Sequence, residues 1–168
     1  LGQPDRALAM IRDAQRLCDE LNHPYTATLA WWFTAWLHHH RGERESAAAA
    51  AERLLALTTE WGFLPWRDAP LVLLPFSRGA RLDTDALAEV RRQLVAARSA
   101  NWRHVFCLCV LAELYAEAGH PEDGVAVLAS IPDADRRAFY APEVLRLDGE
   151  LRLRCEPSRT EAGERAFR

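Results

Sequence analysis

The chain has 168 residues, of which 49% are hydrophobic and 27% charged, a composition ordinary for a globular protein that buries one core. Its formal net charge of −3 gives no excess of positive charge for binding nucleic acid. No signal peptide is evident, and no apolar stretch reaches the roughly 18 residues of a membrane span. We therefore expect a protein that binds neither nucleic acid nor membranes.

Apolar residues recur with the period of an amphipathic α-helix along most of the chain, whereas the period-two alternation of a β-strand is not found. The predicted helices, in chain order, cover Ala7–Leu21, Tyr25–His40, Ala47–Glu60, Asp85–Ala97, Val105–Ala118 and Gly124–Ile131. Between the third and the fourth of these, Pro65 can begin a further helix, which Pro70 and Pro75 then bend or shorten. The sequence predicts an all-α protein.

Three of these helices follow similar short segments, which indicates an internal repeat. The segments are LGQPDRA at Leu1–Ala7, RGERESA at Arg41–Ala47 and AGHPEDG at Ala118–Gly124. Their glycines are about 40 residues apart and then about twice that, and Gly79 fits a fourth copy between them. A period of this size with two helices per unit is typical of an α-solenoid built from antiparallel helix pairs.

The spacing within the last copy is more specific. Its residues follow the pattern L-x-x-L-A-x-x-Y-x-x-x-G-x-x-x-x-small, which resembles the tetratricopeptide repeat (TPR); they are Leu108, Leu111, Ala112, Tyr115, Gly119 and Gly124. An earlier copy has Trp31, Thr34, Ala35, His38, Gly42 and Ala47 at the same positions, with Thr34 and His38 in place of the expected Leu and Tyr. The resemblance implies a right-handed solenoid of about four TPR-like helix pairs over residues 1–153. A linker and the truncated start of a further repeat would follow at 154–168.

A second resemblance lies near the end of the chain. Glu143–Leu151 reads EVLRLDGEL and resembles an element of the helical-repeat arms of large bacterial STAND-type signalling ATPases. Some of these proteins carry an adenylate or guanylate cyclase domain, and others a LuxR-type or SARP-type DNA-binding domain, as in MalT-like transcriptional regulators. The resemblance implies that this chain is a non-catalytic arm, and that its partners include the ATPase domain of a longer polypeptide. The chain has no Lys, so the phosphate loop of an ATPase cannot lie within it.

No candidate metal centre or catalytic site emerges from the residues. His38, His39 and His40 are consecutive, and helical residues about 100° apart cannot converge on one metal ion. The serines lack a nucleophile motif such as G-x-S-x-G. Cys18, Cys107, Cys109 and Cys155 do not have zinc-site spacing, which favours buried free thiols and a reducing cytoplasm. We expect a cytoplasmic chain with no enzymatic activity, no cofactor and no metal.

In the repeat register, a set of side chains faces the concave side of the solenoid, the usual binding surface of such folds. The set consists of Leu29, Trp32, Trp36, His39, His40, Phe106, Cys109, Glu113 and Glu117. Such a lining suits a protein segment or a small polar effector. The alternative is that the aromatic side chains only fill the core of a tightly curved superhelix. A second functional hypothesis is a structural scaffold that self-associates into a homo-oligomer without an effector.

Overall fold

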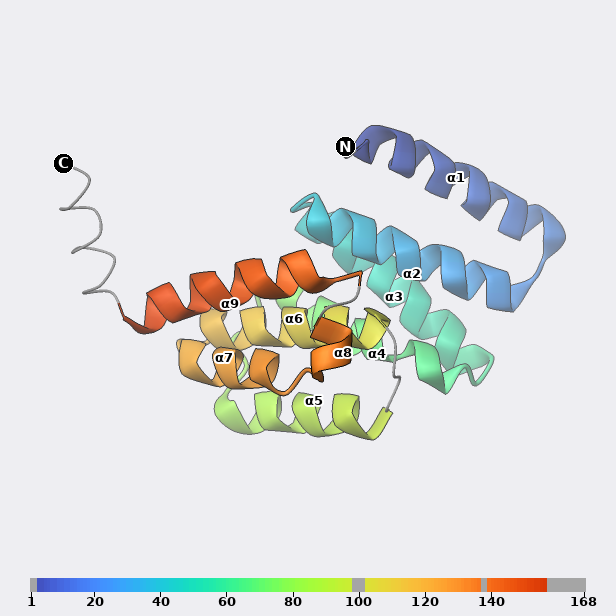
Figure 1. The fold of residues 1–168 in the computed structure, drawn as a ribbon. Helices are drawn as coiled ribbons and strands as arrows, with labels where there is room; N and C mark the ends of the chain where they lie inside the picture. The colour runs from blue at the N-terminus through green and yellow to red at the C-terminus, as the bar shows by residue number, and fades with distance from the viewer. Residues whose placement is uncertain (1–2, 98–101, 137–138, 157–168) are drawn as a thin grey trace. The chain divides into compact units, whose positions relative to one another are not determined.

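A computed structural model describes residues 3–97, 102–136 and 139–156 (Figure 1). Helices account for 83% of these residues, and no strand occurs among them, which confirms the all-α prediction. No helix in these ranges is both long enough and apolar enough to cross a membrane. The chain forms two compact units, residues 1–80 and residues 81–168. A single repeat domain over residues 1–153 stays a prediction.

The first unit contains a series of helices joined by short connections (Figure 1). They are α1 (Pro4–Leu21), α2 (Pro24–His40), α3 (Arg44–Glu60), the 3-10 turn η1 (Leu64–Trp66) and α4 (Asp68–Ser77). Consecutive α-helices pack on each other: α1 on α2, α2 on α3, and α3 on α4. Because connections of two or three residues reverse the chain, α1, α2 and α3 run antiparallel to their neighbours.

The predicted glycine turn closes α2. Gly42 has a φ of 71°, in the left-handed region that favours glycine. Its N–H donates to the carbonyl of His39 at 2.9 Å, and the N–H of Glu43 donates to the carbonyl of His38 at 3.0 Å. These two bonds form a Schellman motif, which satisfies carbonyl groups left free at the helix end. The turn lets α3 begin at Arg44 and return along α2.

Side-chain hydrogen bonds and ion pairs fix α1 on α2. The amide of Gln15 in α1 donates to the hydroxyl of Thr34 in α2 at 2.9 Å. At the other end of the pair, the guanidinium of Arg41 lies 3.0 Å from the carboxylate of Asp5 and 2.7 Å from that of Glu43. Since these contacts join different turns of α1 to α2, they set both the rotation and the register of α1.

The proline-rich segment after α3 forms two elements. Pro65 lies in η1, and α4 begins at Asp68, so the prediction that Pro65 begins this helix is wrong. The carboxylate of Asp68 accepts a hydrogen bond from the N–H of Ala69 at 2.8 Å, within the first turn of the helix. Pro75 lies inside α4, which has only 10 residues. The helix continues past Pro75 to Ser77, so a bend or shortening caused by Pro70 and Pro75 stays a prediction.

The second unit is built around a long buried helix. Its elements are α5 (Thr84–Ala97), α6 (Trp102–Glu117), α7 (Pro121–Ala129), α8 (Asp133–Arg136) and α9 (Ala141–Cys155). Helix α6 packs against α5, α7 and α9, and α7 also packs against α9. Asp83 caps α5, because its carboxylate accepts the N–H of Ala86 at 2.8 Å. The predicted linker at 154–168 begins inside α9, and the predicted start of a further repeat lies outside the described residues.

A glycine allows a close contact between helices in this unit. A Cβ atom on Gly124 of α7 would lie 2.8 Å from the backbone oxygen of Ala112 in α6 and 2.9 Å from Leu151 Cδ1 in α9. Any larger residue would push the helices apart. Gly119, with a φ of 92°, closes α6 in the same way as Gly42 closes α2. The TPR-like pattern therefore places a glycine at both points, Gly124 at the helix contact and Gly119 at the end of α6.

Candidate binding groove

An apolar groove of about 390 Å³ lies between α1 and α2 in the first unit. The side chains that line it from α1 share one face of that helix, and they are Met10, Ile11, Ala14, Leu17, Cys18 and Leu21. The facing wall consists of Thr26, Leu29, Ala30 and Phe33 of α2, with His23 beside the turn. None of these residues is an Asp, Glu or Arg, so the groove presents an almost entirely apolar surface.

Large apolar side chains of α1 are exposed along this groove. Met10 is 64% exposed, Leu17 51% and Leu21 71%. They recur at intervals of three or four residues together with the small Ala14, so they form one stripe of about 16 Å along the helix. Contiguous exposed apolar patches are uncommon on monomeric proteins and mark surfaces that bind a partner. This stripe is the strongest candidate for a binding surface in the part of the chain that the structure describes.

The structure divides the residues predicted on α2 between the groove and the core. Leu29 lines the groove, as does its neighbour Phe33. Trp32 has no exposed surface, so its assignment to an open groove is wrong, and the alternative of a core position applies. Trp36 is half-buried, and its ring contacts those of Phe33 and His40 edge-on. Helix α2 packs against α1, α3 and α4, which leaves little of its surface open.

The three consecutive histidines have three different neighbours. His38 Nδ1 lies 2.6 Å from a carboxylate oxygen of Glu43, and this contact lowers the pKa of Glu43. The ring of His39 contacts the ring of Phe76 in α4, with centroids 5.1 Å apart. The ring of His40 contacts that of Trp36 at 5.0 Å. The rings of His39 and His40 also contact each other edge-on, with centroids 5.2 Å apart. Apart from that contact, each imidazole has a different neighbour: Glu43, Phe76 or Trp36.

The residues predicted on α6 belong to the second unit and are mostly buried. Phe106 is fully buried and contacts Tyr140 edge-on, with ring centroids 6.0 Å apart. Cys109 is also buried, which raises the pKa of its thiol above the ordinary value. The prediction that these two side chains line an open groove is wrong, because α6 is surrounded by α5, α7 and α9. Glu117 is exposed at the end of the helix.

Glu113 takes part in an ion-pair network that joins α6 to α9. Arg146 donates to both carboxylate oxygens of Glu143, at 2.7 and 2.9 Å, and to Glu150 at 2.8 Å. Its guanidinium lies 3.9 Å from the carboxylate of Glu113. Burial and the negative charge of Glu143 raise the pKa of Glu113 to about 7, although Arg146 opposes the shift. Three carboxylates thus lie around one guanidinium, and the raised pKa of Glu113 means that folding disfavours its charged form.

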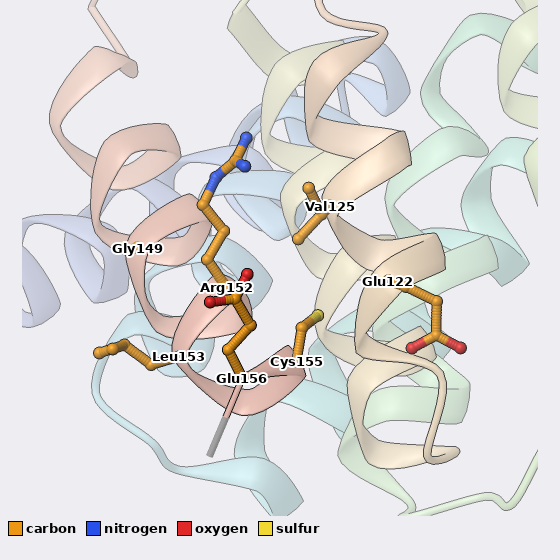
Figure 2. Close-up of a pocket in the computed structure, with 7 residues that line it drawn as sticks. All are labelled: Glu122, Val125, Gly149, Arg152, Leu153, Cys155 and Glu156. Carbon is orange, nitrogen blue, oxygen red and sulfur yellow. The ribbon is translucent and has the colours of Figure 1, made fainter. Parts of the chain in front are cut away.

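A larger cavity of about 600 Å³ lies between α7 and α9, as Figure 2 shows. Val125 of α7 and Cys155 of α9 point into the space between the two helices, whereas Leu153 points away (Figure 2). Arg152 pairs with Asp148 on its own helix at 2.8 Å. Gly149 leaves part of the wall without a side chain. The lining combines charged and aliphatic groups, and among the described residues no reactive pair of side chains is directed into it.

Three possible metal ligands lie together at the start of α7. One ligand atom each of His120, Glu122 and Asp123 lies within 4.8 Å of the others. Glu122 is exposed and the other two are half-buried, and acidic residues are common in the first turn of a helix. Among the described residues no further feature at this place points to a cation. We therefore assign no metal site to it.

Cysteine burial follows the sequence expectation at three of four positions. Cys18, Cys107 and Cys109 are buried free thiols, whereas Cys155 is exposed. Burial raises the pKa of Cys18, which keeps its thiol protonated beside the groove. These thiols contribute packing rather than reactivity.

The sequence prediction does not include the α1 side of the groove. Met10, Leu17 and Leu21 lie in the amphipathic run predicted at Ala7–Leu21, where their apolar stripe is visible as a packing face. A sequence pattern shows that a face is apolar, but it does not show whether another helix covers it.

Comparison of the chain with protein-family models, curated proteins and solved structures finds no match.

Proposed function

We propose that this chain is a non-catalytic interaction arm of TPR-like helix pairs that belongs to a larger bacterial signalling ATPase or transcriptional regulator. The proposal builds on the repeat pattern and on the resemblance of Glu143–Leu151 to such arms. It is supported by the helix pairs, by the glycine turns at Gly42 and Gly119, and by the small residue at the fourth position of the next helix, Ala47 or Gly124. The single observation that carries the binding function is the exposed apolar groove between α1 and α2.

The chemistry of the groove favours a protein segment over a small polar effector. Its lining contains no carboxylate and no guanidinium that could orient a polar ligand, and His23 and Thr26 are its polar members. Burying Met10, Leu17 and Leu21 against apolar side chains of a partner would gain about 25 cal/mol for each Å² removed from water. The arm thus binds an apolar segment through area and shape.

Binding in the groove could be coupled to signalling by a difference in affinity. A partner shifts the equilibrium between two arrangements of an arm and its ATPase only if it binds one arrangement more tightly. In this proposal, the ATPase domain of the parent chain is the second partner, and the groove is available in one arrangement.

Selection of peptides from a displayed random library against the purified chain tests the proposed function. The expected result is a set of peptides with apolar residues that bind the chain and lose binding to the double variant Leu17→Glu, Leu21→Glu. The matched control is Leu64→Glu, because Leu64 is a 64% exposed leucine in the same unit that does not line the groove. Failure to enrich any peptide that depends on Leu17 and Leu21 would contradict the proposal.

Self-association is the second candidate, and the same exposed stripe favours it. Sedimentation at several concentrations measures it directly. A dimer that the Leu17→Glu, Leu21→Glu variant abolishes would support a structural scaffold in place of an interaction arm.

A further inference from the structure

The chain itself contains two helices, α3 and α7, that correspond to α1 and have a buried packing face. Counted from the first residue of each helix, the fourth, seventh and eighth positions of α3 are Ala47, Ala50 and Ala51. All three are buried, with exposed fractions of at most 1%. In α7 the same positions are Gly124, Val127 and Leu128, and these are also buried. The register is therefore a packing face in both units.

In each case, the cover consists of a preceding and a following helix. Helix α3 packs against α2 and α4, and α7 packs against α6 and α9. The preceding helix α6 lies very close to α7: the backbone oxygen of Ala112 would be 2.8 Å from a Cβ atom on Gly124. The preceding helices also touch the following ones, α2 on α4 and α6 on α9. The pair α3 and α4 thus forms a groove that α2 fills, and the pair α7 and α9 forms a groove that α6 fills.

Helix α1 has the same register, but part of its packing face is open. Its fourth, seventh and eighth positions are Ala7, Met10 and Ile11, and Met10 is largely exposed. The following helix, α2, is in place and forms the second wall of the groove through Leu29 and Phe33. What α1 and α2 lack, by comparison with the other two pairs, is a helix in the position that α2 holds on α3 and α6 holds on α7.

We infer that the occupant of the α1–α2 groove is an α-helix with an uncharged apolar face that runs antiparallel to α1. This inference rests on the proposed function and names the partner of that site. The direction follows from the short turns that make α2 antiparallel to α3 and α6 antiparallel to α7. The eleventh position of α1 is Ala14, where α3 has Leu54 and the chain after α7 has Ile131. The partner helix therefore presents a large apolar side chain to Ala14.

A synthetic helical peptide derived from α6 tests the inference. The peptide has 16 residues, the length of α6, and keeps the stripe Leu108, Leu111, Ala112 and Tyr115 at its native spacing, with Glu and Lys elsewhere. Fluorescence anisotropy of the labelled peptide measures its affinity for the chain. Leu17→Glu is expected to weaken binding by about tenfold or more, because the variant places a charge against the apolar face. Leu64→Glu, the control, is expected to bind as the unchanged chain does.

Two further measurements separate a helix from other occupants. Ala14→Leu fills the groove without adding a charge and is expected to weaken binding, while circular dichroism of the variants checks that they remain folded. A peptide with a central proline cannot continue as a helix and is expected not to bind.

Equal binding of the proline peptide would overturn the helical occupant and leave the proposed function standing, provided that Leu17 still mattered. Unchanged affinity of the helical peptide for both Leu17→Glu and Ala14→Leu would overturn the inference as well. Dimerisation through Leu17 would replace the partner helix by a second copy of the chain. If the library selection enriched no peptide whose binding depends on Leu17, the proposed function itself would be overturned.

Discussion

Helices α1 and α7 have the same packing register, but other helices cover this face in α7 and leave much of it exposed in α1. In α7 the register positions are covered by α6 and α9, so closely that Gly124 has no room for a side chain. In α1 the following helix covers one side, and Met10, Leu17 and Leu21 are left in contact with solvent. The difference shows that the same amphipathic pattern can build a core or present a binding surface. What decides is whether a second helix lies on it.

The largest expected effect concerns α2, which forms one wall of the groove and part of the core. Trp32→Ala should lower the free energy of unfolding by about 4 kcal/mol, because it removes a fully buried indole. Trp36→Ala should cost less than about 2 kcal/mol, since this side chain is half-buried. Urea denaturation followed by circular dichroism measures both. Equal losses in the two variants would contradict the division of α2 into core and surface.

A pair of leucine substitutions tests the comparison at the fourth position of each helix. Gly124→Leu should destabilise the chain by about 3 kcal/mol, because the new side chain meets the backbone of α6. Ala7→Leu, at the same position of α1, should change stability by less than about 1 kcal/mol, because Ala7 is half-exposed. Gly149→Leu is the matched glycine control, since a Cβ there meets no atom within 4 Å. A mild effect at Gly124 would mean that α6 and α7 are not in close contact at this point.

A smaller effect is expected from Glu113, the half-buried carboxylate of the second unit. The pKa of Glu113 is raised to about 7 from its ordinary value of 4.5, so the folded chain binds more protons than the unfolded chain between these pH values. Stability should therefore fall as the pH rises from about 4.5 to 7 and then level off. Glu113→Gln removes the charge and should stabilise the chain by about 1 to 2 kcal/mol at pH 8, with little gain at pH 5.

The control for this pH dependence is Glu117→Gln, an exposed glutamate on the same helix. Its substitution should change stability by less than about 0.5 kcal/mol at either pH. Thermal unfolding at pH 5 and pH 8 measures all three proteins. A gain for Glu113→Gln that is equal at the two pH values would show that the carboxyl group does not titrate between them.

Most of the secondary structure could be predicted from the sequence, because apolar period and turn residues agree locally. The prediction Tyr25–His40 differs from α2 by one residue, and Gly42 ends this helix as expected. One exception is Pro65, which lies in a separate 3-10 turn instead of beginning the next α-helix. The others are α8 and α9, for which no helix range is predicted. A proline fits either element, since both accept its φ angle, and the sequence alone does not decide between them.

The candidate site is harder to predict because α2 and α6, which carry most of the predicted site residues, are apolar on nearly every side. Helix α6 buries every residue from Val105 to Ala112, so its periodicity gives no contrast between a groove face and a core face. The assignments of Trp32, Phe106 and Cys109 to the groove are wrong for this reason. In α1 the contrast is strong, but it shows only which face is apolar. Whether that face is covered depends on packing between elements, which a local pattern does not contain.

Oxidation of Met10 by hydrogen peroxide tests most directly whether the α1 face is open. Met10 is the single methionine of the chain and lies in the groove, so peptide mass spectrometry after alkylation of the thiols reports on this one place. We expect Met10 in the folded monomer to be oxidised at a rate close to that of the unfolded chain, and the α6-derived peptide to slow the reaction. Strong protection of Met10 in the folded monomer without peptide would contradict an open α1 face.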